Sequence, residues 1–258
     1  MGFSSLKSGD DALSQVDTAW ESGRPMLGLV VGNTHHHWAW FRSNRLWRTW
    51  QTPGEHATAV WAFGQRTYPL RIVSVVPAAT RHWQVHPLAQ VVTLAHIPLQ
   101  ETYPSLGVDR ALAVWGAGQR WGRPALVIDA GTGLSLTGMD AAGRLMGGAI
   151  LPGWSLQHRM LHQQTGALPW VPLPDGLPDR WARDTTTAIQ SGVFYTLVAG
   201  LVDFVTDWAE RFPGPMVVTG GDGPRLWPHL CARLPGTLGV RLHLEPHHLL
   251  HSLGALEI

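Results

Sequence analysis

The chain has 258 residues and a mass of 28.3 kDa, with 45% hydrophobic and 14% charged residues. A chain of this length can bury one large core or two smaller ones, and its hydrophobic content excludes disorder over most of its length. Its 19 basic and 18 acidic side chains leave a formal charge of +1. That charge lacks the strong positive field of nucleic-acid-binding proteins, so we expect no nucleic-acid partner.

The single cysteine, Cys231, excludes an intrachain disulfide and any multi-thiolate metal site, which favours a reducing, cytoplasmic compartment. Residues 1–24 are polar and lack the apolar centre of a signal peptide, so we interpret them as a flexible leader. Residues 185–202 carry no charge and approach the length of a membrane span. Their hydroxyl and amide side chains favour a helix buried within the protein instead, and we expect no membrane partner.

The first half of the chain predicts strands followed by alternating helices and strands. Three short β segments at 26–33, 36–43 and 45–52, separated by turn residues, are typical of a β-meander. Hydrophobic periodicity then predicts four further elements. These are a helix over 55–65, a strand over 71–77, a helix near 78–86 and a strand over 91–96.

The second half repeats this order. A helix is predicted from Asp109 to about Trp121, where Gly122 and Pro124 end it. The later predicted elements are β segments at 125–133, 134–140 and 144–153, a helix over 154–164, a proline-rich loop over 168–178, a long helix from Thr185 to about Phe212, and a strand at 215–219 that enters a glycine loop.

Two segments, LVVGNT at 29–34 and VIDAGT at 127–132, share an apolar strand followed by a glycine tip. The repeat at about half the chain length predicts an α/β protein of two similar lobes facing each other across a cleft. We place the lobes at residues 25–121 and 122–258. The matched positions are Val30 with Asp129, Gly32 with Gly131 and Asn33 with Thr132.

Glycine tips after apolar strands suit phosphate binding, because their backbone N–H groups and small hydroxyls allow close approach. Two tips could clamp one polyphosphate, and the loop at 220–223 offers a third glycine turn. Each tip alone is more often a plain turn. The three together indicate nucleotide binding.

Two aspartates carry the strongest chemical signal. Asp109 lies at a predicted helix start beside Arg110, which keeps its carboxylate ionised; the alternative is a structural aspartate that only caps free amides. Asp129 ends an apolar strand, where a carboxylate needs a cation or hydrogen-bond donors to offset its desolvation. A metal ion is a natural partner. The histidine clusters at 35–37 and 247–251 lack a third ligand, so we expect no zinc site there.

The sequence resembles the type III pantothenate kinases in the order and spacing of six motifs, over nearly all of residues 27–243. The combination of GVDR, DAGTG and GGAILPG is specific to that family. The motifs are GNT at 32–34, TYPSLGVDR at 102–110, LVIDAGTG at 126–133, GGAILPG at 147–153, TTTAIQSGVFY at 185–195 and TGGDG at 219–223.

This resemblance implies an actin-like fold, of the acetate and sugar kinase, Hsp70 and actin superfamily, with duplicated ribonuclease H-like lobes. It implies a homodimer that phosphorylates pantothenate to 4'-phosphopantothenate with ATP, the first step of coenzyme A biosynthesis. It also implies Mg²⁺ bound with ATP and a monovalent cation, K⁺ or NH₄⁺.

The resemblance further implies a role for each matched residue. Asp109 would be the catalytic proton acceptor, and Asp129 would ligate the monovalent cation. The residues implied to contact pantothenate are Tyr103, Gly107, Val108, Asp109, Arg110 and Thr185, and those implied to hold the ATP phosphates are Gly32, Asn33, Thr34 and Thr132.

The chain departs from the family pattern at two positions. The family usually has Asp-x-Gly-Asn-Thr with a lysine three residues after the threonine, whereas this chain has Val30 and His37 in the Asp and Lys positions. One charged contact to the nucleotide's metal is therefore absent and another is weakened. The sequence leaves open an active kinase with an altered phosphate loop, a catalytically silent relative that binds nucleotide or pantothenate as a regulator, and an enzyme of the same superfold with another substrate.

Overall fold

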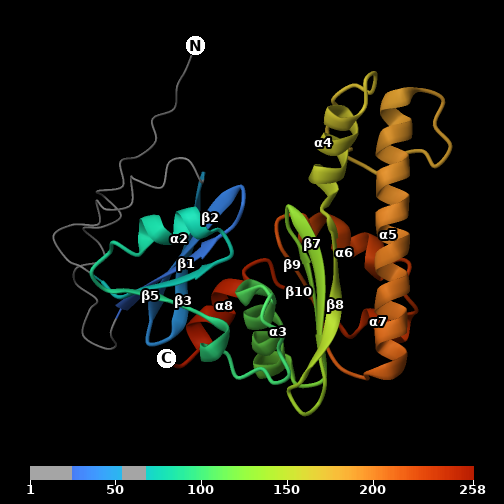
Figure 1. Ribbon diagram of the computed structural model, residues 1–258. Helices are drawn as coiled ribbons and strands as arrows, with labels where there is room; N and C mark the ends of the chain where they lie inside the picture. The colour runs from blue at the N-terminus through green and yellow to red at the C-terminus, as the bar shows by residue number, and fades with distance from the viewer. Residues whose placement is uncertain (1–24, 54–67) are drawn as a thin grey trace. The chain divides into compact units, whose positions relative to one another are not determined.

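A computed structural model describes residues 25–53 and 68–258, which fall into two compact units (Figure 1). Unit 1 ends at Val91 and unit 2 begins at Val92. Each unit is built on a five-stranded sheet.

The sheet of unit 1 has the strand order β3-β2-β1-β4-β5. β1, β2 and β3 form an antiparallel meander, as the sequence predicts, and β4 and β5 continue the sheet parallel to β1. A tryptophan cluster fills its core, where Trp38 stacks on Trp50 with ring centroids 6.0 Å apart. The elements are β1 (Pro25–Val31), β2 (His35–Arg42), β3 (Arg45–Pro53), β4 (Leu70–Ser74), α2 (Pro77–Trp83), β5 (Ala89–Val91).

Two elements predicted between residues 55 and 96 are not confirmed. The helix predicted over 55–65 lies outside the described residues. The strand predicted over 91–96 is wrong beyond Val91, where β5 ends, and Leu94–His96 at the start of unit 2 forms a short 3₁₀ helix, η2. Thr93 and His96 cap each other's backbone there, and this local hydrogen bonding competes with strand pairing.

The sheet of unit 2 has the order β10-β9-β6-β7-β8. The predicted helices and strands between 109 and 219 are confirmed, with α5 ending one residue before Phe212. The elements are α3 (Val108–Trp121), β6 (Ala125–Ala130), β7 (Gly133–Met139), β8 (Leu145–Pro152), α4 (Trp154–Gln164), α5 (Thr185–Arg211), β9 (Met216–Thr219), α6 (Gly223–Cys231), α7 (Gly236–Gly239), β10 (Leu242–Leu244), α8 (His248–Ala255).

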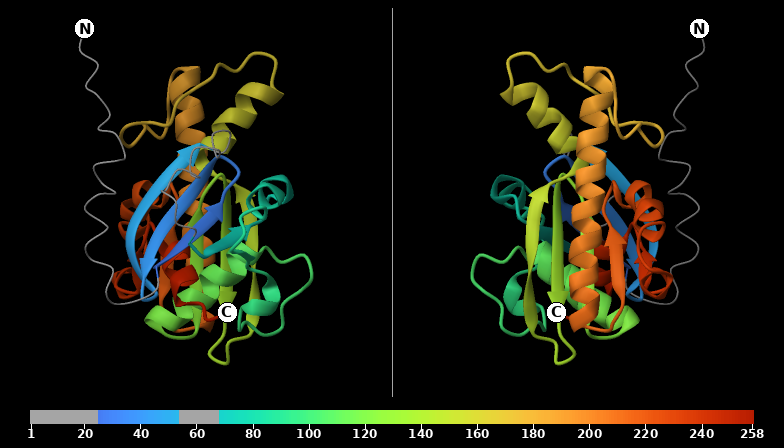
Figure 2. Two further views of the ribbon diagram at one scale, coloured as in Figure 1. Left: turned by 90° about the vertical axis from the view of Figure 1, so that its left-hand side faces the viewer. Right: turned by 90° about the vertical axis from the view of Figure 1, so that its right-hand side faces the viewer.

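Helices cover both faces of this second sheet. α3 and α8 lie on one face, while α5 and α6 pack on the other (Figures 1 and 2). Within the described residues α5 is long and apolar enough to cross a membrane by length and composition alone. One side of it, from Ile189 to Val205, nevertheless joins the buried core. We therefore interpret α5 as a core helix of unit 2.

The two sheets confirm the internal repeat. Each has an antiparallel meander whose first strand pairs in parallel with a later strand, followed by one more parallel strand. Each also has a register shift at the same place, after Trp40 and after Gly138. In unit 1, Val30 pairs with His37, and the shift follows three residues later, after Trp40. In unit 2, the matched residue Asp129 pairs with Ser135, and the shift again follows three residues later, after Gly138.

The compact units divide the chain earlier than the sequence suggests. The boundary falls after Val91, whereas the expected lobes meet at Trp121. α3 belongs with unit 2 because it packs against β6, β7 and α8.

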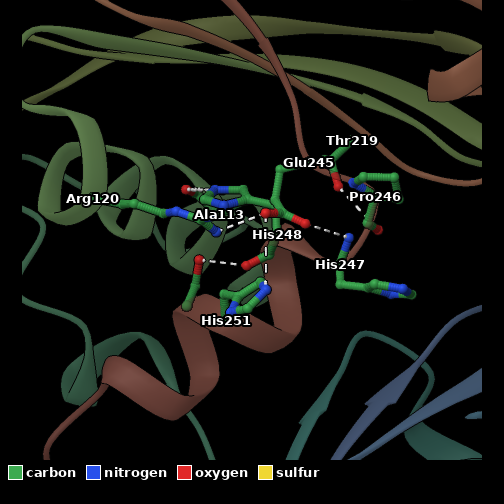
Figure 3. Close-up of polar contacts among 9 residues, drawn as sticks. Ala113, Arg120, Thr219, Glu245, Pro246, His247, His248 and His251 are labelled. Atoms are coloured by element: carbon green, nitrogen blue, oxygen red, sulfur yellow. Dashed lines mark hydrogen bonds and ion pairs between the residues drawn. The ribbon is translucent and has the colours of Figure 1, made fainter. Parts of the chain in front are cut away.

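Helix α8 fixes the position of α3 through close packing and polar contacts (Figure 3). His248 is buried and anchors the backbone of α3, since its Nε2–H donates to the carbonyl oxygen of Ala113 at 2.7 Å. Arg120 forms an ion pair of 2.7 Å with Glu245. A Cβ at Gly116 would lie 1.9 Å from Oγ of Ser252, so only glycine allows this approach.

His248 is expected to make the stability of this packing pH-dependent. Burial lowers its pKa from 6.5 to about 4, since its Nδ1 has no partner within the described residues to receive a proton. Between these two values the unfolded chain binds a proton that the folded chain does not. The free energy of unfolding should therefore fall by about 3 kcal/mol as the pH falls from 6.5 to 4.

Chemical denaturation across this pH range tests the prediction. His248→Gln keeps an N–H donor for Ala113 but cannot titrate, so its stability should depend less steeply on pH. His247→Gln, at the exposed neighbouring position, is the matched control and should keep the wild-type dependence. If the free energy of unfolding depends on pH equally steeply in His248→Gln and in the wild type, the pH dependence does not come from His248.

Candidate active site

Asp109 lies in the first turn of α3, shortly after the N-cap Gly107. The segment TYPSLG turns into the helix so that the carboxylate sits at its positive end. The backbone N–H of Arg110 donates to Oδ1 of Asp109 at 2.7 Å. Burial raises the pKa of Asp109, and the N–H and charge of Arg110 partly offset that effect.

Asp129 lies near the end of β6, between Ser135 of β7 and Thr219 of β9 in the sheet register. Burial raises the pKa of its carboxyl to about 6, and the negative charge of Asp109 contributes to the increase. The two aspartates are therefore close enough to influence each other electrostatically, although they are predicted from separate motifs.

Two glycine loops converge on the carboxylate of Asp129. Gly220 has a φ of +84°, and a Cβ there would lie 2.5 Å from Oδ1 of Asp129. A Cβ at Gly131, on the β6–β7 tip, would lie 3.7 Å from the same oxygen. The N–H of Asp222 donates to the carbonyl oxygen of Ala130 at 2.9 Å, which ties the two loops together. Only small residues fit around this carboxylate.

The structure allows a direct test of whether Asp129 suits a cation. Within residues 25–53 and 68–258, no side chain or backbone N–H forms a hydrogen bond or ion pair with its carboxylate. A half-buried carboxylate without such a partner would be stabilised by a bound cation that supplies the missing charge. Its oxygens are the donor type that a hard cation prefers, and the glycine loops bring only backbone beside them.

Arg110 projects from α3 onto the β7–β8 pair of strands. Its Nε–H donates to Oγ1 of Thr137 at 3.0 Å, and Nη1 donates to the hydroxyl of Tyr103 at 3.2 Å. Three residues expected to contact substrate, Tyr103, Asp109 and Arg110, thus lie together, with Gly107 and Val108 beside them at the helix start.

The remaining expected residues of unit 2 lie at two other element ends. Thr132 forms the β6–β7 tip, where its carbonyl oxygen accepts from the N–H of Gly153 at 2.9 Å. Thr185 is the exposed first residue of α5, whose N-terminus is capped by Asp184. No hydrogen bond joins Thr185 to Asp109 or Arg110.

The expected phosphate tip of unit 1 is a hairpin between β1 and β2. The N–H of Gly32 donates to the carbonyl oxygen of His35 at 3.0 Å, while Asn33 and Thr34 are exposed at the turn. Val30, only 7% exposed, pairs directly with His37 across the two strands. The two departures from the family pattern are therefore one cross-strand pair, whose side chains share a face of the sheet.

Sequence reasoning missed Thr137 and Gly148, which support Arg110. Alternation along β7 could have indicated Thr137, since it shares a face with Ser135, the neighbour of Asp129. Gly148 lies within a recognised motif, but its contact with Arg110 depends on the pairing of β7 with β8.

Comparison with known proteins agrees with this arrangement. A family model described as type III pantothenate kinase matches residues 26–207. The type III pantothenate kinase of Synechococcus sp. (strain JA-3-3Ab) is 48% identical over 230 residues, covering 88% of this chain and 90% of the relative. That of Nostoc sp. (strain PCC 7120) is 44% identical over 249 residues, covering 86% and 90%.

Solved structures show the fold alone. The ethanolamine utilization protein EutJ of Carboxydothermus hydrogenoformans superposes with a TM-score of 0.53 at 12% identity, over 96% of this chain and 98% of that one. Lmo2764 of Listeria monocytogenes, described as a candidate N-acetylmannosamine kinase, gives a TM-score of 0.51 at 12% identity, over 90% and 98%. The fold is the actin-like, sugar kinase type, and the chain belongs to the type III pantothenate kinase family.

Proposed function

We propose that this chain catalyses the ATP-dependent phosphorylation of pantothenate to 4'-phosphopantothenate, the first step of coenzyme A biosynthesis. The observation that carries the proposal is the pairing of Asp109 at a helix N-terminus with Asp129 beside two glycine loops. It agrees with family membership and with the names of the relatives. The expected substrates are pantothenate and ATP bound with Mg²⁺.

Asp109 would orient the attacking hydroxyl of pantothenate and accept its proton. Phosphoryl transfer requires mainly positioning and charge neutralisation, so a base need only take the proton late in the reaction. The raised pKa of Asp109 makes its carboxylate a better proton acceptor than an exposed aspartate, while the helix N-terminus and Arg110 keep it ionised.

Asp129 would ligate the monovalent cation, K⁺ or NH₄⁺, and Thr132 with the tip at Gly32, Asn33 and Thr34 would hold the ATP phosphates. A cation at Asp129 would supply positive charge near the phosphates. The glycine loops at 131 and 220 bring backbone close to the carboxylate without a side chain between them.

Arg110 would anchor the carboxylate of pantothenate through its guanidinium, with Tyr103, Gly107, Val108 and Thr185 completing the substrate site. A guanidinium binds a carboxylate through paired N–H donors. Thr185 is exposed at the first position of α5, so its hydroxyl would be accessible to substrate.

We further propose that the enzyme is a cytoplasmic homodimer. The resemblance to the type III pantothenate kinases is the basis for the proposed dimer. Large apolar side chains that are exposed on unit 2, among them Ile150, Trp181 and Phe204, would be available to contact a second copy.

A coupled ADP-release assay with pantothenate, ATP, Mg²⁺ and K⁺ tests the function. Asp109→Asn should lower kcat at least ~100-fold because the proton acceptor is lost, while calorimetry should still detect pantothenate binding. Asp207→Asn, in an exposed ion pair on α5, is the control and should keep full activity. Absence of turnover by the wild type at millimolar ATP would favour the silent, regulatory alternative.

The pKa of Asp129 predicts how activity responds to acid and to K⁺. Below about pH 6 the carboxyl takes up a proton and loses its charge, so kcat/KM should fall. Because a cation competes with that proton, raising the K⁺ concentration should move the fall to lower pH. If kcat/KM falls at the same pH in low and high K⁺, Asp129 does not bind the cation.

The cross-strand pair at Val30 and His37 predicts a gain in ATP affinity by substitution. Val30→Asp should lower the KM for ATP, and Val30→Asp with His37→Lys should lower it further, since opposite residues of an antiparallel pair can form an ion pair that offsets burial of the carboxylate. The KM for pantothenate is the internal control and should not change. An unchanged or higher KM for ATP in the double variant would contradict the prediction.

A further inference from the structure

The guanidinium of Arg110 is held by three hydrogen bonds from two separate segments. Nε–H donates to Oγ1 of Thr137 at 3.0 Å, and Nη2 donates to the carbonyl oxygen of Leu136 at 3.4 Å, both on β7. Nη1 donates to the hydroxyl of Tyr103 at 3.2 Å, on the segment before α3. The longest of these bonds is weak, so Thr137 and Tyr103 contribute most of the orientation.

Thr137 is the rigid member of this set. Its side chain is 1% exposed and belongs to a central strand, whereas Tyr103 is 41% exposed on a loop. Thr137 pairs in register with Gly148 of β8. A Cβ at Gly148 would lie 2.6 Å from Nη2 of Arg110, so the missing side chain makes room for the guanidinium.

Some N–H groups of the Arg110 guanidinium remain available to a ligand. A guanidinium has five N–H groups, and the structure commits the one on Nε, one on Nη1 and one on Nη2. As far as residues 25–53 and 68–258 show, each terminal nitrogen therefore keeps one N–H. Two such N–H groups form the fork that binds a carboxylate through both oxygens.

We propose that Thr137 is a positioning residue that selects acceptors bearing a carboxylate, by fixing the guanidinium of Arg110 with its terminal N–H groups turned to the ligand. The inference rests on the proposed pantothenate kinase activity and extends it to a residue outside the family motifs. Thr137 acts through Arg110 and does not contact the reacting atoms.

Loss of the Thr137 hydroxyl would release Nε and allow the guanidinium to rotate. A fork that is already oriented loses less rotamer entropy for each hydrogen bond it forms with a ligand. A mobile fork would bind a carboxylate more weakly. It would leave an acceptor without a carboxylate unaffected, because such an acceptor does not use the fork.

The experiment compares two acceptors, pantothenate and its neutral analogue with a hydroxymethyl group in place of the carboxylate. Thr137→Val has the same shape but accepts no hydrogen bond from Nε. It should raise the KM for pantothenate ~10-fold, as expected when a side chain that Thr137 had ordered must be immobilised on binding, with kcat and the KM for ATP changed less than ~2-fold. For the neutral analogue, the KM of the Thr137→Val variant should equal the KM of the wild type.

Two further variants separate positioning from general damage. Thr137→Ser retains the hydroxyl and should restore the wild-type KM for pantothenate. Thr80→Val removes a threonine hydroxyl that bonds the carbonyl oxygen of Val76 in unit 1, and should leave all constants unchanged. If Thr137→Val fails to fold in a thermal unfolding assay, Thr137→Ala provides the same comparison without the added methyl group.

The proposal is overturned by an unchanged KM for pantothenate, by an equal rise for both acceptors, or by failure of Thr137→Ser to restore binding. A wild type that phosphorylates neither acceptor would contradict the proposed function instead. In that case calorimetry of pantothenate binding decides the inference. Weaker binding by Thr137→Val supports it, whereas equal binding, or no binding by the wild type, overturns it.

Discussion

The electrostatics of unit 2 depend on two carboxylates that lie near each other with too little compensating charge. Asp109 has the helix N-terminus and Arg110, whereas Asp129 has no hydrogen-bonding partner among the described residues and a pKa raised to about 6. This imbalance favours different roles for chemically identical side chains. In the proposed reaction the compensated aspartate would accept the proton, and the uncompensated one would be stabilised by a cation beside it.

The surrounding backbone supports that arrangement. The glycine loops after β6 and β9 bring main chain to the carboxylate of Asp129 without side chains between them, and Gly220 adopts the positive φ that this approach requires. Further along α3, His248 and the Gly116–Ser252 contact hold the helix that carries Asp109. A site that requires accurate positioning is thus built on a sheet and a buttressed helix.

The two departures at Val30 and His37 form a single structural change, because they are partners across one hairpin. The aspartate and lysine usual in the family would face each other at these positions as an ion pair, so the two departures remove both members of that pair. The proposed acceptor-site residues Tyr103, Asp109 and Arg110 keep the family pattern. In the proposed function the two departures would therefore alter contacts with the nucleotide and leave the acceptor residues unchanged.

The sequence by itself determined most of the order of strands and helices up to residue 219, the internal repeat, the glycine loops and the two aspartates, but not the four elements after residue 222. These features depend on hydrophobic periodicity and on glycine and proline, which act over a few neighbouring residues. It could not determine the 3₁₀ turn at Leu94–His96, where local capping replaced a strand. Only the tertiary structure decided which distant groups meet, because strand register and helix docking set those contacts. Thr137 reaches Arg110 across 27 residues and His248 reaches Ala113 across 135, and no local pattern encodes either distance.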